Sequence, residues 1–363
     1  MKNYETVALN PNSFIHLTEH LAPICVIMGM PLLLTDENHE KMAKKYYPGL
    51  QTLLLNWQEV TPQYLIENYD VFFQSEPWPR KDFYRNYQKL EEYHQKQVRN
   101  VFCPHGFSDK LFWFEKCVLE DITLIYGQNM IDMLKSMGIE QNLNVAVRTG
   151  NYRYQFYKKH KIFYDKIAEE EVFSKFAKKQ TTILYAPTCN DQDNNTSFMD
   201  SDQFMDELPD SYNLIIKIHP ELEETNGPDL YKMMGKFEKK KNITFVKDFP
   251  LVFPILAKTD IYLGDRSSIG YDFLAFNRPM FFLNKFKRDA LTDRNLFLFR
   301  CGMEVVPEQY PEFYQLLEKH LPVDKENYGT IRSEIYQYTF GNEIPFEELK
   351  KSITQSFFSS KKD

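Results

Sequence analysis

The chain has 363 residues, a length that suits two domains with full hydrophobic cores. Its formal net charge of -7 disfavours nucleic acid as a partner, because a nucleic-acid-binding protein needs a basic face. Its five cysteines form no C-x-x-C pair, and no apolar window is long enough for a signal peptide or a bilayer span, so we expect a cytoplasmic protein in a reduced compartment.

The first part of the sequence predicts an α/β domain over residues 1–155. Short apolar runs alternate with polar and helical stretches, a pattern that is typical of a parallel sheet covered by helices. The predicted strands fall at 31–34, 53–55, 71–73, 101–103, 124–127 and 145–147, with helices at 79–99 and 128–138. Residues 148–153 are predicted to form a polar loop.

Two places in this first part carry candidate catalytic groups. Glu19 and His20 near a helix start suit an acid–base pair, although a surface helix cap with a core-facing histidine explains them equally well. His105 and Gly106 directly follow the predicted strand at 101–103, which places an imidazole at the rim of the sheet. Gly106 allows the backbone to approach a ligand closely.

A charged helical stretch at 156–180 is predicted to link this domain to a second α/β domain at 181–335. A C-terminal tail at 336–363 contains apolar residues at helical spacing and is predicted to pack across the domain junction. The strands of the second domain are predicted at 182–186, 212–218, 243–246, 261–263 and 280–283, and helices at 201–208 and 251–258.

The stretch 260–284 organises the second domain. It reads as a strand, a polar turn, a helix and the next strand, and in such a unit the turn lies at the ligand-binding edge of an open sheet. Ser267 and Ser268 stand at the helix start, where hydroxyls and free N–H groups suit a phosphate. Simple helix capping is the alternative, but Asp265 and Arg266 beside the pair favour a phosphate site.

Further polar residues lie at the ends of other strands of the second domain. Thr188 and His219 each follow a predicted strand. Lys217 alternates with apolar residues, so it points to a face of the sheet, and a structural role is the alternative to donor binding. No Gly-x-Gly-x-x-Gly or P-loop motif is present, so neither a dinucleotide fold signature nor a P-loop is supported. Asp191-Gln-Asp193 spells D-x-D, but it stands in an Asn- and Asp-rich loop where solvation explains it better, and no metal or other cofactor is predicted.

These motifs resemble the CDP-glycerol glycerophosphotransferases, the teichoic acid polymerases and primases. In the second domain the resemblance rests on Tyr185-Ala-Pro-Thr188, Lys217-Ile-His-Pro220 and Asp265-Arg-Ser-Ser268, together with Asp272 and Arg278-Pro279. In the first domain it rests on Pro104-His105-Gly106 with Lys110, and on Gly150-Asn-Tyr-Arg153. The resemblance implies a GT-B-type fold, in which two Rossmann-like domains face each other across a cleft.

The resemblance also implies an activity and roles for residues. The enzyme is expected to move a polyol phosphate from a CDP-activated donor to a hydroxyl of a glycan or lipid-linked acceptor, in cell-envelope polymer or glycan synthesis, with loss of CMP. His105 is the candidate general base, whereas His219, Ser267 and Ser268 are expected to hold the donor phosphates. The other donor-site candidates are Thr188, Lys217, Asp265, Arg266 and Asp272, and the other first-domain candidates are Gly106, Lys110 and Arg153.

Three alternatives stay open at this stage. They are a GT-B glycosyltransferase that uses a nucleotide sugar, an enzyme resembling the UDP-N-acetylhexosamine epimerases, and a nucleotide-binding module without catalysis. The sequence also leaves open a peripheral contact with the inner face of a membrane. Short basic runs at 158–161, 239–241 and 285–288 are candidates for such a contact, although a solvated surface explains each of them better.

Overall fold

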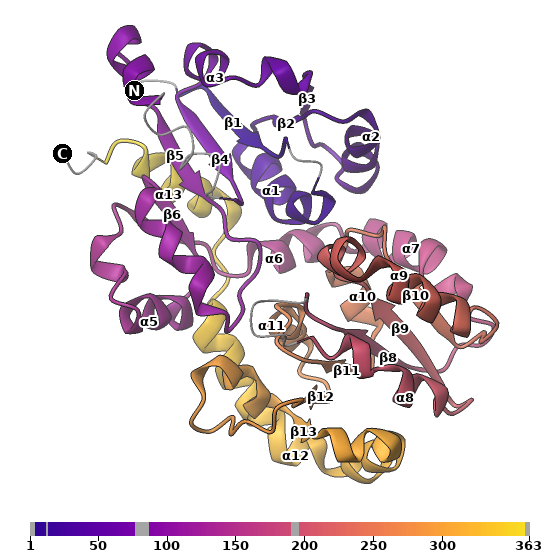
Figure 1. The fold of residues 1–363 in the computed structure, drawn as a ribbon. Helices are drawn as coiled ribbons and strands as arrows, with labels where there is room; N and C mark the ends of the chain where they lie inside the picture. Colours follow the sequence, from indigo (N-terminus) through magenta and orange to yellow (C-terminus); the bar gives the residue numbers. More distant parts are fainter. Residues whose placement is uncertain (1–3, 12–13, 77–86, 190–195, 360–363) are drawn as a thin grey trace. The chain divides into compact units, whose positions relative to one another are not determined.

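The structure is a computed structural model that describes residues 4–11, 14–76, 87–189 and 196–359. Its contacts divide the chain into two compact units. The first unit comprises residues 1–107, 111–156 and 338–363, and the second comprises 108–110 and 157–337. Each unit holds one parallel sheet accompanied by helices (Figure 1), so the predicted α/β class is confirmed.

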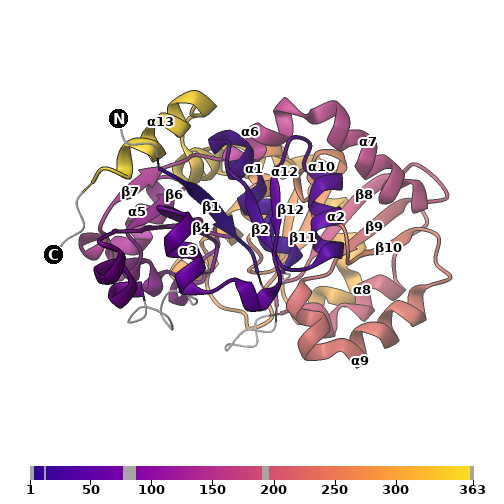
Figure 2. The same cartoon turned by 90° about the horizontal axis from the view of Figure 1, so that it is seen from above.

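The sheet of the first unit has seven strands in the order β3-β2-β1-β4-β5-β6-β7. Its strands are short and mostly apolar, as expected where helices cover both faces of a parallel sheet. Figures 1 and 2 show β1 and β4 side by side, and there the strand order reverses. The strands are β1 (Thr6–Leu9), β2 (Leu32–Leu34), β3 (Thr52–Leu54), β4 (Val71–Gln74), β5 (Arg99–Phe102), β6 (Ile122–Ile125) and β7 (Ala146–Arg148).

The helices of the first unit include α1, which runs directly after β1 and is buried over most of its length. Gly29 ends α1 in the left-handed conformation (φ 75°), and its N–H donates to the carbonyl of Cys25. The helices are α1 (Ile15–Met28), α2 (Glu37–Tyr46), α3 (Pro62–Asn68), α5 (Gln128–Ser136), α6 (Tyr152–Lys159) and α13 (Phe346–Ser356). Short 3-10 helices lie at Trp57–Glu59, Leu111–Leu119 and Glu140–Asn142.

The sheet of the second unit has six parallel strands in the order β10-β9-β8-β11-β12-β13. A core of buried apolar residues, including Ile183, Leu214, Leu263 and Phe281 from four different strands, packs against the helices on this sheet. The order reverses between β8 and β11, so the crevice at their carboxyl ends is the expected ligand site of such a sheet. The strands are β8 (Thr181–Ala186), β9 (Tyr212–Lys217), β10 (Ile243–Val246), β11 (Ile261–Gly264), β12 (Met280–Leu283) and β13 (Met303–Val305).

The helices of the second unit differ widely in length. The longest, α12, extends three residues beyond position 337 into the first unit. The helices are α7 (Lys161–Glu171), α8 (Asp202–Asp206), α9 (Pro220–Phe237), α10 (Phe253–Lys258), α11 (Ile269–Phe273) and α12 (Phe313–Phe340). Short 3-10 helices lie at Phe173–Lys175, Phe198–Asp200, Leu274–Phe276, Arg294–Cys301 and Pro307–Glu312.

Two segments fall differently from the domain limits that the sequence suggested. The stretch 157–180, expected as a linker, is counted with the second unit, where α7 contacts α10. The C-terminal residues 338–363 are counted with the first unit, and there α13 packs against α1 and β7. The predicted apolar face of this tail is buried, since Leu349, Ile353 and Phe357 are at most 1% exposed.

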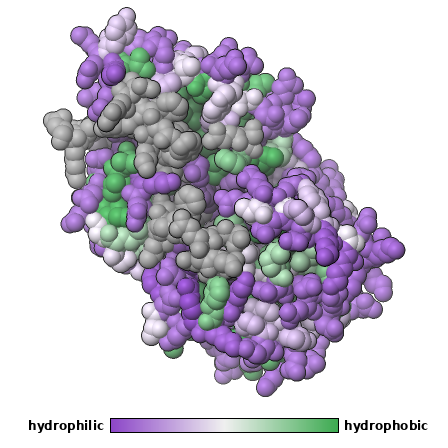
Figure 3. Space-filling view, viewed as in Figure 1, coloured by the Kyte–Doolittle hydropathy of each residue, from purple (hydrophilic) through white to green (hydrophobic). Residues whose placement is uncertain are grey.

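The surface is that of a protein with ordinary polar cover. The face shown in Figure 3 is mostly hydrophilic, with small separate apolar areas. Among the helices of the described ranges, none combines the length and the apolar character that crossing a membrane requires.

Candidate functional site

The carboxyl ends of β8, β9 and β11 bring the predicted donor-site residues to one edge of the second sheet. β8 lies between β9 and β11 in the sheet, and all three strands are parallel. Thr188 follows β8, His219 follows β9, and residues 265–268 follow β11. These polar residues therefore border the crevice at which the strand order reverses.

Asp265 is the centre of the hydrogen bonds at this edge. It is 1% exposed, and its carboxylate accepts from the backbone N–H of Thr188 (2.8 Å) and of Ser197 (2.9 Å) and from the Ser197 hydroxyl (2.7 Å). Burial raises the pKa of Asp265 above its ordinary value, whereas these hydrogen bonds and the Lys110 ammonium act in the opposite direction. Asp265 thus joins the loop after β11 to the loop after β8, so its carboxylate has a structural role at this edge of the sheet.

Lys110 is part of the second unit, although the sequence placed it with the first domain. Its ammonium donates to the Thr188 hydroxyl (2.5 Å) and lies 3.5 Å from the sulfur of Cys189. Lys110 is 6% exposed. This places a cation at the carboxyl end of β8, where the negative charge of a phosphate needs a partner.

His219 caps helix α9 with its own side chain. Its Nδ1 accepts from the backbone N–H of Glu221 (3.3 Å), and Pro220 occupies the first helical position. An Nδ1 that accepts requires the proton of a neutral ring to be on Nε2. His219 therefore offers a hydrogen-bond donor, and the first turn of α9 adds the partial positive charge of a helix start.

The serine pair lies where the sequence placed it, but the helix behind it is short. Ser268 is the residue before α11, and its hydroxyl makes no capping hydrogen bond. Side-chain capping therefore does not explain Ser268. Because α11 has only 5 residues, its dipole is smaller than that of a full-length helix, and the hydroxyls of Ser267 and Ser268 matter more than the helix start.

The remaining donor-site candidates have different surroundings. Arg266 is 6% exposed and donates to the carbonyl (3.1 Å) and the side-chain oxygen (3.4 Å) of Asn295. Asp272 is buried in α11, and Lys217 is the half-buried last residue of β9. Arg278 from the family motif donates to the backbone carbonyls of Ala257 and Thr259, so it holds the end of α10.

Asp109 is a buried acid whose partners no sequence pattern indicates. It accepts from the Tyr271 hydroxyl (2.7 Å), the Arg294 guanidinium (2.7 Å) and the N–H of Leu298 (3.0 Å), all in the second unit. Burial raises its pKa, which the positive charge of Arg294 opposes. Because Asp109 and Lys110 are adjacent, the hydrogen bonds that fix Asp109 also help to keep Lys110 beside Thr188.

In the first unit, His105 lies shortly after β5, at the edge of the sheet where β4 and β5 end. Its Nδ1 lies 3.2 Å from the carbonyl oxygen of Ser75 and 3.4 Å from Oε1 of Glu76. The following Gly106 has a φ of 105°, which a residue with a side chain rarely adopts, and its N–H donates to the Tyr126 hydroxyl (3.2 Å). The sharp turn that His-Gly provides after the strand is therefore built as the sequence indicated.

Glu19 and His20, which the sequence suggests as an acid–base pair, are consecutive residues of α1. Both residues are buried in α1, and the Glu19 carboxylate lies 3.6 Å from the guanidinium of Arg153. Burial, and then the positive charge of Arg153, lowers the pKa of His20 well below its ordinary value, so this ring is neutral. The rings of His20 and His16 each lie 6.4 Å from the ring of His105, which makes a cluster of three imidazoles at the β1–β4 crevice.

One group of side chains has the spacing of metal ligands. The ligand atoms of Cys189, His219 and Glu221 lie within 4.8 Å of one another. The Lys110 ammonium lies 3.5 Å from the sulfur of Cys189, so a positive charge already stands beside this group and would repel a metal cation. We therefore assign no metal to this group. The D-x-D sequence at 191–193 lies outside the described residues.

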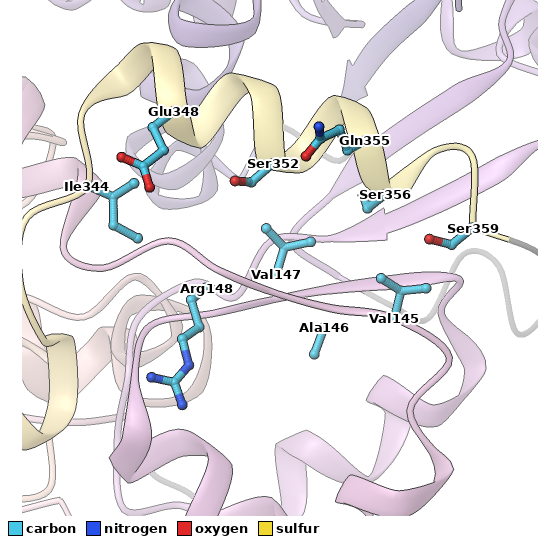
Figure 4. Close-up of a pocket in the computed structure, with 10 residues that line it drawn as sticks. All are labelled: Val145, Ala146, Val147, Arg148, Ile344, Glu348, Ser352, Gln355, Ser356 and Ser359. Atoms are coloured by element: carbon cyan, nitrogen blue, oxygen red, sulfur yellow. The ribbon is translucent and has the colours of Figure 1, made fainter.

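A pocket of about 470 Å³ lies elsewhere in the first unit, between β7 and α13. Figure 4 shows Val147 pointing toward α13 and Arg148 pointing away from it. Serines and glutamine of α13 form the other wall. None of the predicted site residues lines this pocket, so it is not the candidate active site.

Comparison with known families identifies part of the chain. Residues 141–288 match the sequence model of the family "CDP-Glycerol:Poly(glycerophosphate) glycerophosphotransferase". This stretch contains Arg153 and all the donor-site candidates of the second unit, so the family predicted from the motifs is confirmed there. No curated protein sequence matches the chain significantly.

Solved structures confirm the GT-B-type fold of the chain. The wall teichoic acid polymerase TagF is similar with a TM-score of 0.65 and 12% identity, over 97% of this chain and 89% of that one. MnaA of S. aureus, solved with UDP, has a TM-score of 0.64 and 14% identity over 99% of each chain. HepE (Alr3699) of Anabaena, solved with UDP and glucose, has a TM-score of 0.57 and 10% identity over 99% of this chain and 100% of that one.

Proposed function

We propose that the chain transfers a polyol phosphate of the glycerophosphate type from a CDP-activated donor to an acceptor hydroxyl in the synthesis of a cell-envelope polymer. The observation that carries the proposal is the family match over residues 141–288, which covers the polar edge at β8, β9 and β11. The similarity to TagF, solved with its ligand CDPG in one crystal, agrees with a nucleotide-activated donor. The acceptor is proposed to be a glycan or a lipid-linked molecule.

The residues of the second unit are proposed to hold the donor. Lys110 supplies a positive charge, His219 donates through Nε2, and the hydroxyls of Thr188, Ser267 and Ser268 bind phosphate oxygens. As the phosphoanhydride bond breaks, these groups stabilise the charge that develops on the leaving CMP. Asp265 holds the loops in place, since its oxygens are occupied by N–H and O–H donors.

The first unit is proposed to supply the base. Nε2 of His105 takes the proton of the acceptor hydroxyl, the acceptor oxygen forms a bond to phosphorus, and CMP leaves with the electron pair of the broken P–O bond. General-base catalysis of this kind contributes roughly 10²- to 10⁴-fold in rate. His105→Ala is therefore expected to lower kcat by about that factor with little change in donor affinity, whereas His94→Ala, at another histidine of the same unit, is the matched control. Near-normal turnover by His105→Ala would remove this role.

A donor panel tests the activity itself. The protein is incubated with CDP-glycerol, CDP-ribitol, a UDP-sugar or a CMP-sugar, each with and without poly(glycerophosphate) as acceptor, and the nucleotide product is quantified. CMP release from a CDP-polyol that requires the acceptor is the expected result. Turnover of the UDP-sugar alone would contradict the proposal.

A second candidate is an enzyme that acts on a UDP-sugar. It is favoured by the full-length similarity to MnaA with UDP and to the UDP-GlcNAc 2-epimerase of Neisseria meningitidis with UDP-GlcNAc (TM-score 0.56). The same panel separates the two, because an epimerase-like enzyme consumes UDP-GlcNAc without any acceptor. A binding module without catalysis would bind CMP or CDP and turn over none of the donors.

Peripheral contact with a membrane stays a prediction. The basic run 285–288 contains Phe286, which is 49% exposed. Its cations have acidic neighbours, since Lys285 lies 3.4 Å from Asp200 and Arg288 lies 3.1 Å from Asp293. Such local pairing reduces the attraction to an anionic surface.

A further inference from the structure

We propose that Glu76 is a positioning residue that fixes the tautomer and the orientation of His105. The inference rests on the proposed function for its catalytic meaning, because the base is assigned there. Neither the family motifs nor the sequence patterns include Glu76, which stands two residues after the end of β4.

The hydrogen-bonding chemistry around Nδ1 of His105 determines the tautomer. Two oxygens lie near it, the Ser75 carbonyl oxygen at 3.2 Å and Oε1 of Glu76 at 3.4 Å. A carbonyl only accepts, and an ionised carboxylate only accepts, so Nδ1 has to carry the proton. The lone pair of a neutral His105 is then on Nε2, which is the state that a general base needs.

The sheet places these residues together. β4 and β5 are adjacent and parallel, with Gln74 paired to Phe102 at their ends. The residues that directly follow both strands therefore emerge at one edge, beside the β1–β4 crevice. The side chains are partly accessible, 23% for Glu76 and 31% for His105, so a substrate hydroxyl can reach the ring while the carboxylate stays beside it.

Other titratable and charged groups also lie around His105. From α1, the rings of His16 and His20 face it, and His20 is neutral because burial and Arg153 lower its pKa. Arg153, on α6, has Glu19 as its acidic neighbour at 3.6 Å. The carboxylate of Glu76 lies closer to the His105 ring, with Oε1 3.4 Å from Nδ1.

The contribution of Glu76 grows during the reaction. When Nε2 accepts the proton of the hydroxyl, the ring becomes an imidazolium, and the contact at Nδ1 becomes a charge-assisted hydrogen bond. Such bonds are roughly twice as strong as neutral ones. Because both side chains are partly solvated, we expect the loss of the carboxylate to lower kcat by about tenfold, with KM within about twofold of its original value.

The experiment compares the wild type with Glu76→Gln, which keeps the size of the side chain but removes its charge. Glu37→Gln, at an exposed glutamate of α2 in the same unit, is the matched control. The tautomer of His105 is measured by NMR from the 15N shifts of both ring nitrogens, with His105→Asn used for assignment, and a thermal melt checks the fold. Steady-state kinetics with CDP-glycerol and poly(glycerophosphate) give kcat and KM.

The expected result is the Nδ1–H tautomer in the wild type and in Glu37→Gln, and an increased share of the Nε2–H tautomer in Glu76→Gln together with the loss in kcat. An Nε2–H tautomer in the wild type would overturn the proposal. A loss of kcat in Glu76→Gln with an unchanged tautomer would also overturn it, because it would indicate a merely structural effect. If the wild type turns over no CDP-glycerol while the tautomer still depends on Glu76, the proposed function fails and the positioning role stands.

Discussion

The stability of the first unit should depend on pH through His39. This residue of α2 is 2% exposed, and its Nε2 lies 2.7 Å from the hydroxyl of Thr18, which also accepts from the Asn10 side chain (3.0 Å). The contact braces α1, the helix that carries His16 and His20. Burial lowers the pKa of His39 from 6.5 to about 4, an effect that the nearby Asp36 partly opposes.

The sign and the size of the effect follow from this lowered pKa. A lowered pKa means that the folded state favours the neutral ring, so the contribution of His39 is fully present above about pH 6.5 and is lost as the pH falls toward 4. With about 1.4 kcal/mol per pKa unit, the free energy of unfolding should fall by about 2 kcal/mol between pH 7 and pH 5, and by about 3 kcal/mol at pH 4. His39→Gln should lack this part of the pH dependence.

The assay uses the position of the tryptophans. All 3 tryptophans of the sequence belong to the first unit, so their fluorescence in urea follows the unfolding of that unit. The quantity of interest is the difference in unfolding free energy between the wild type and His39→Gln at each pH, because groups that titrate in both proteins cancel. His94→Gln removes a less buried histidine of the same unit and is the control. A difference that stays constant within about 0.5 kcal/mol from pH 7 to pH 4 would refute the reasoning.

Three further outcomes are expected. Lys110→Met should weaken CMP binding by about tenfold or more in calorimetry, because the cation at the Thr188 hydroxyl is lost. Lys319→Met, at an exposed lysine, should leave CMP binding unchanged. Equal CMP affinities of the wild type and Lys110→Met would contradict the assignment. Arg332→Met should lower the free energy of unfolding of the second unit, measured in urea, by about 3–5 kcal/mol, because it leaves the buried Asp324 without its cationic partner. Adding Asp324→Leu should restore most of this free energy. A double variant that is no more stable than Arg332→Met would disprove this account. A thiol reagent should modify none of the five buried cysteines within minutes in the folded protein and all of them in guanidinium, and rapid native labelling would contradict the burial.

The parallel sheets could be predicted largely from local sequence. The strands at 243–246 and 280–283 have the predicted limits, because a short run of apolar and β-branched residues bounded by turns leaves few other interpretations. β1 (Thr6–Leu9) was not predicted, since four residues beside a polar terminus give little signal. The helix α1 continues through Pro23, because burial of the helix outweighs the local cost of a proline.

Some residues of the candidate site could likewise be predicted from the sequence, and others could not. Thr188, His219 and Ser267 could be found because each directly follows a strand, and parallel strands end at a common edge. Glu76 and Asp109 could not be found, since their partners depend on which strands are neighbours and on contacts up to 189 residues apart in the chain. The proximity of Glu19 to Arg153 (3.6 Å) could not be predicted either, because the two residues stand on different helices far apart in the sequence.

The way in which the chain alternates between its two units has a consequence for recombination. Residues 108–110 interrupt the first unit, and residues 338–363 return to it after the second is complete. A single genetic crossover near position 157 between this gene and a relative would therefore give a chimera whose second unit receives Asp109 and Lys110 from one parent and their partners from the other. Functional exchange of whole units would require several simultaneous breakpoints, so we expect related genes to have diverged by point substitution more readily than by shuffling halves.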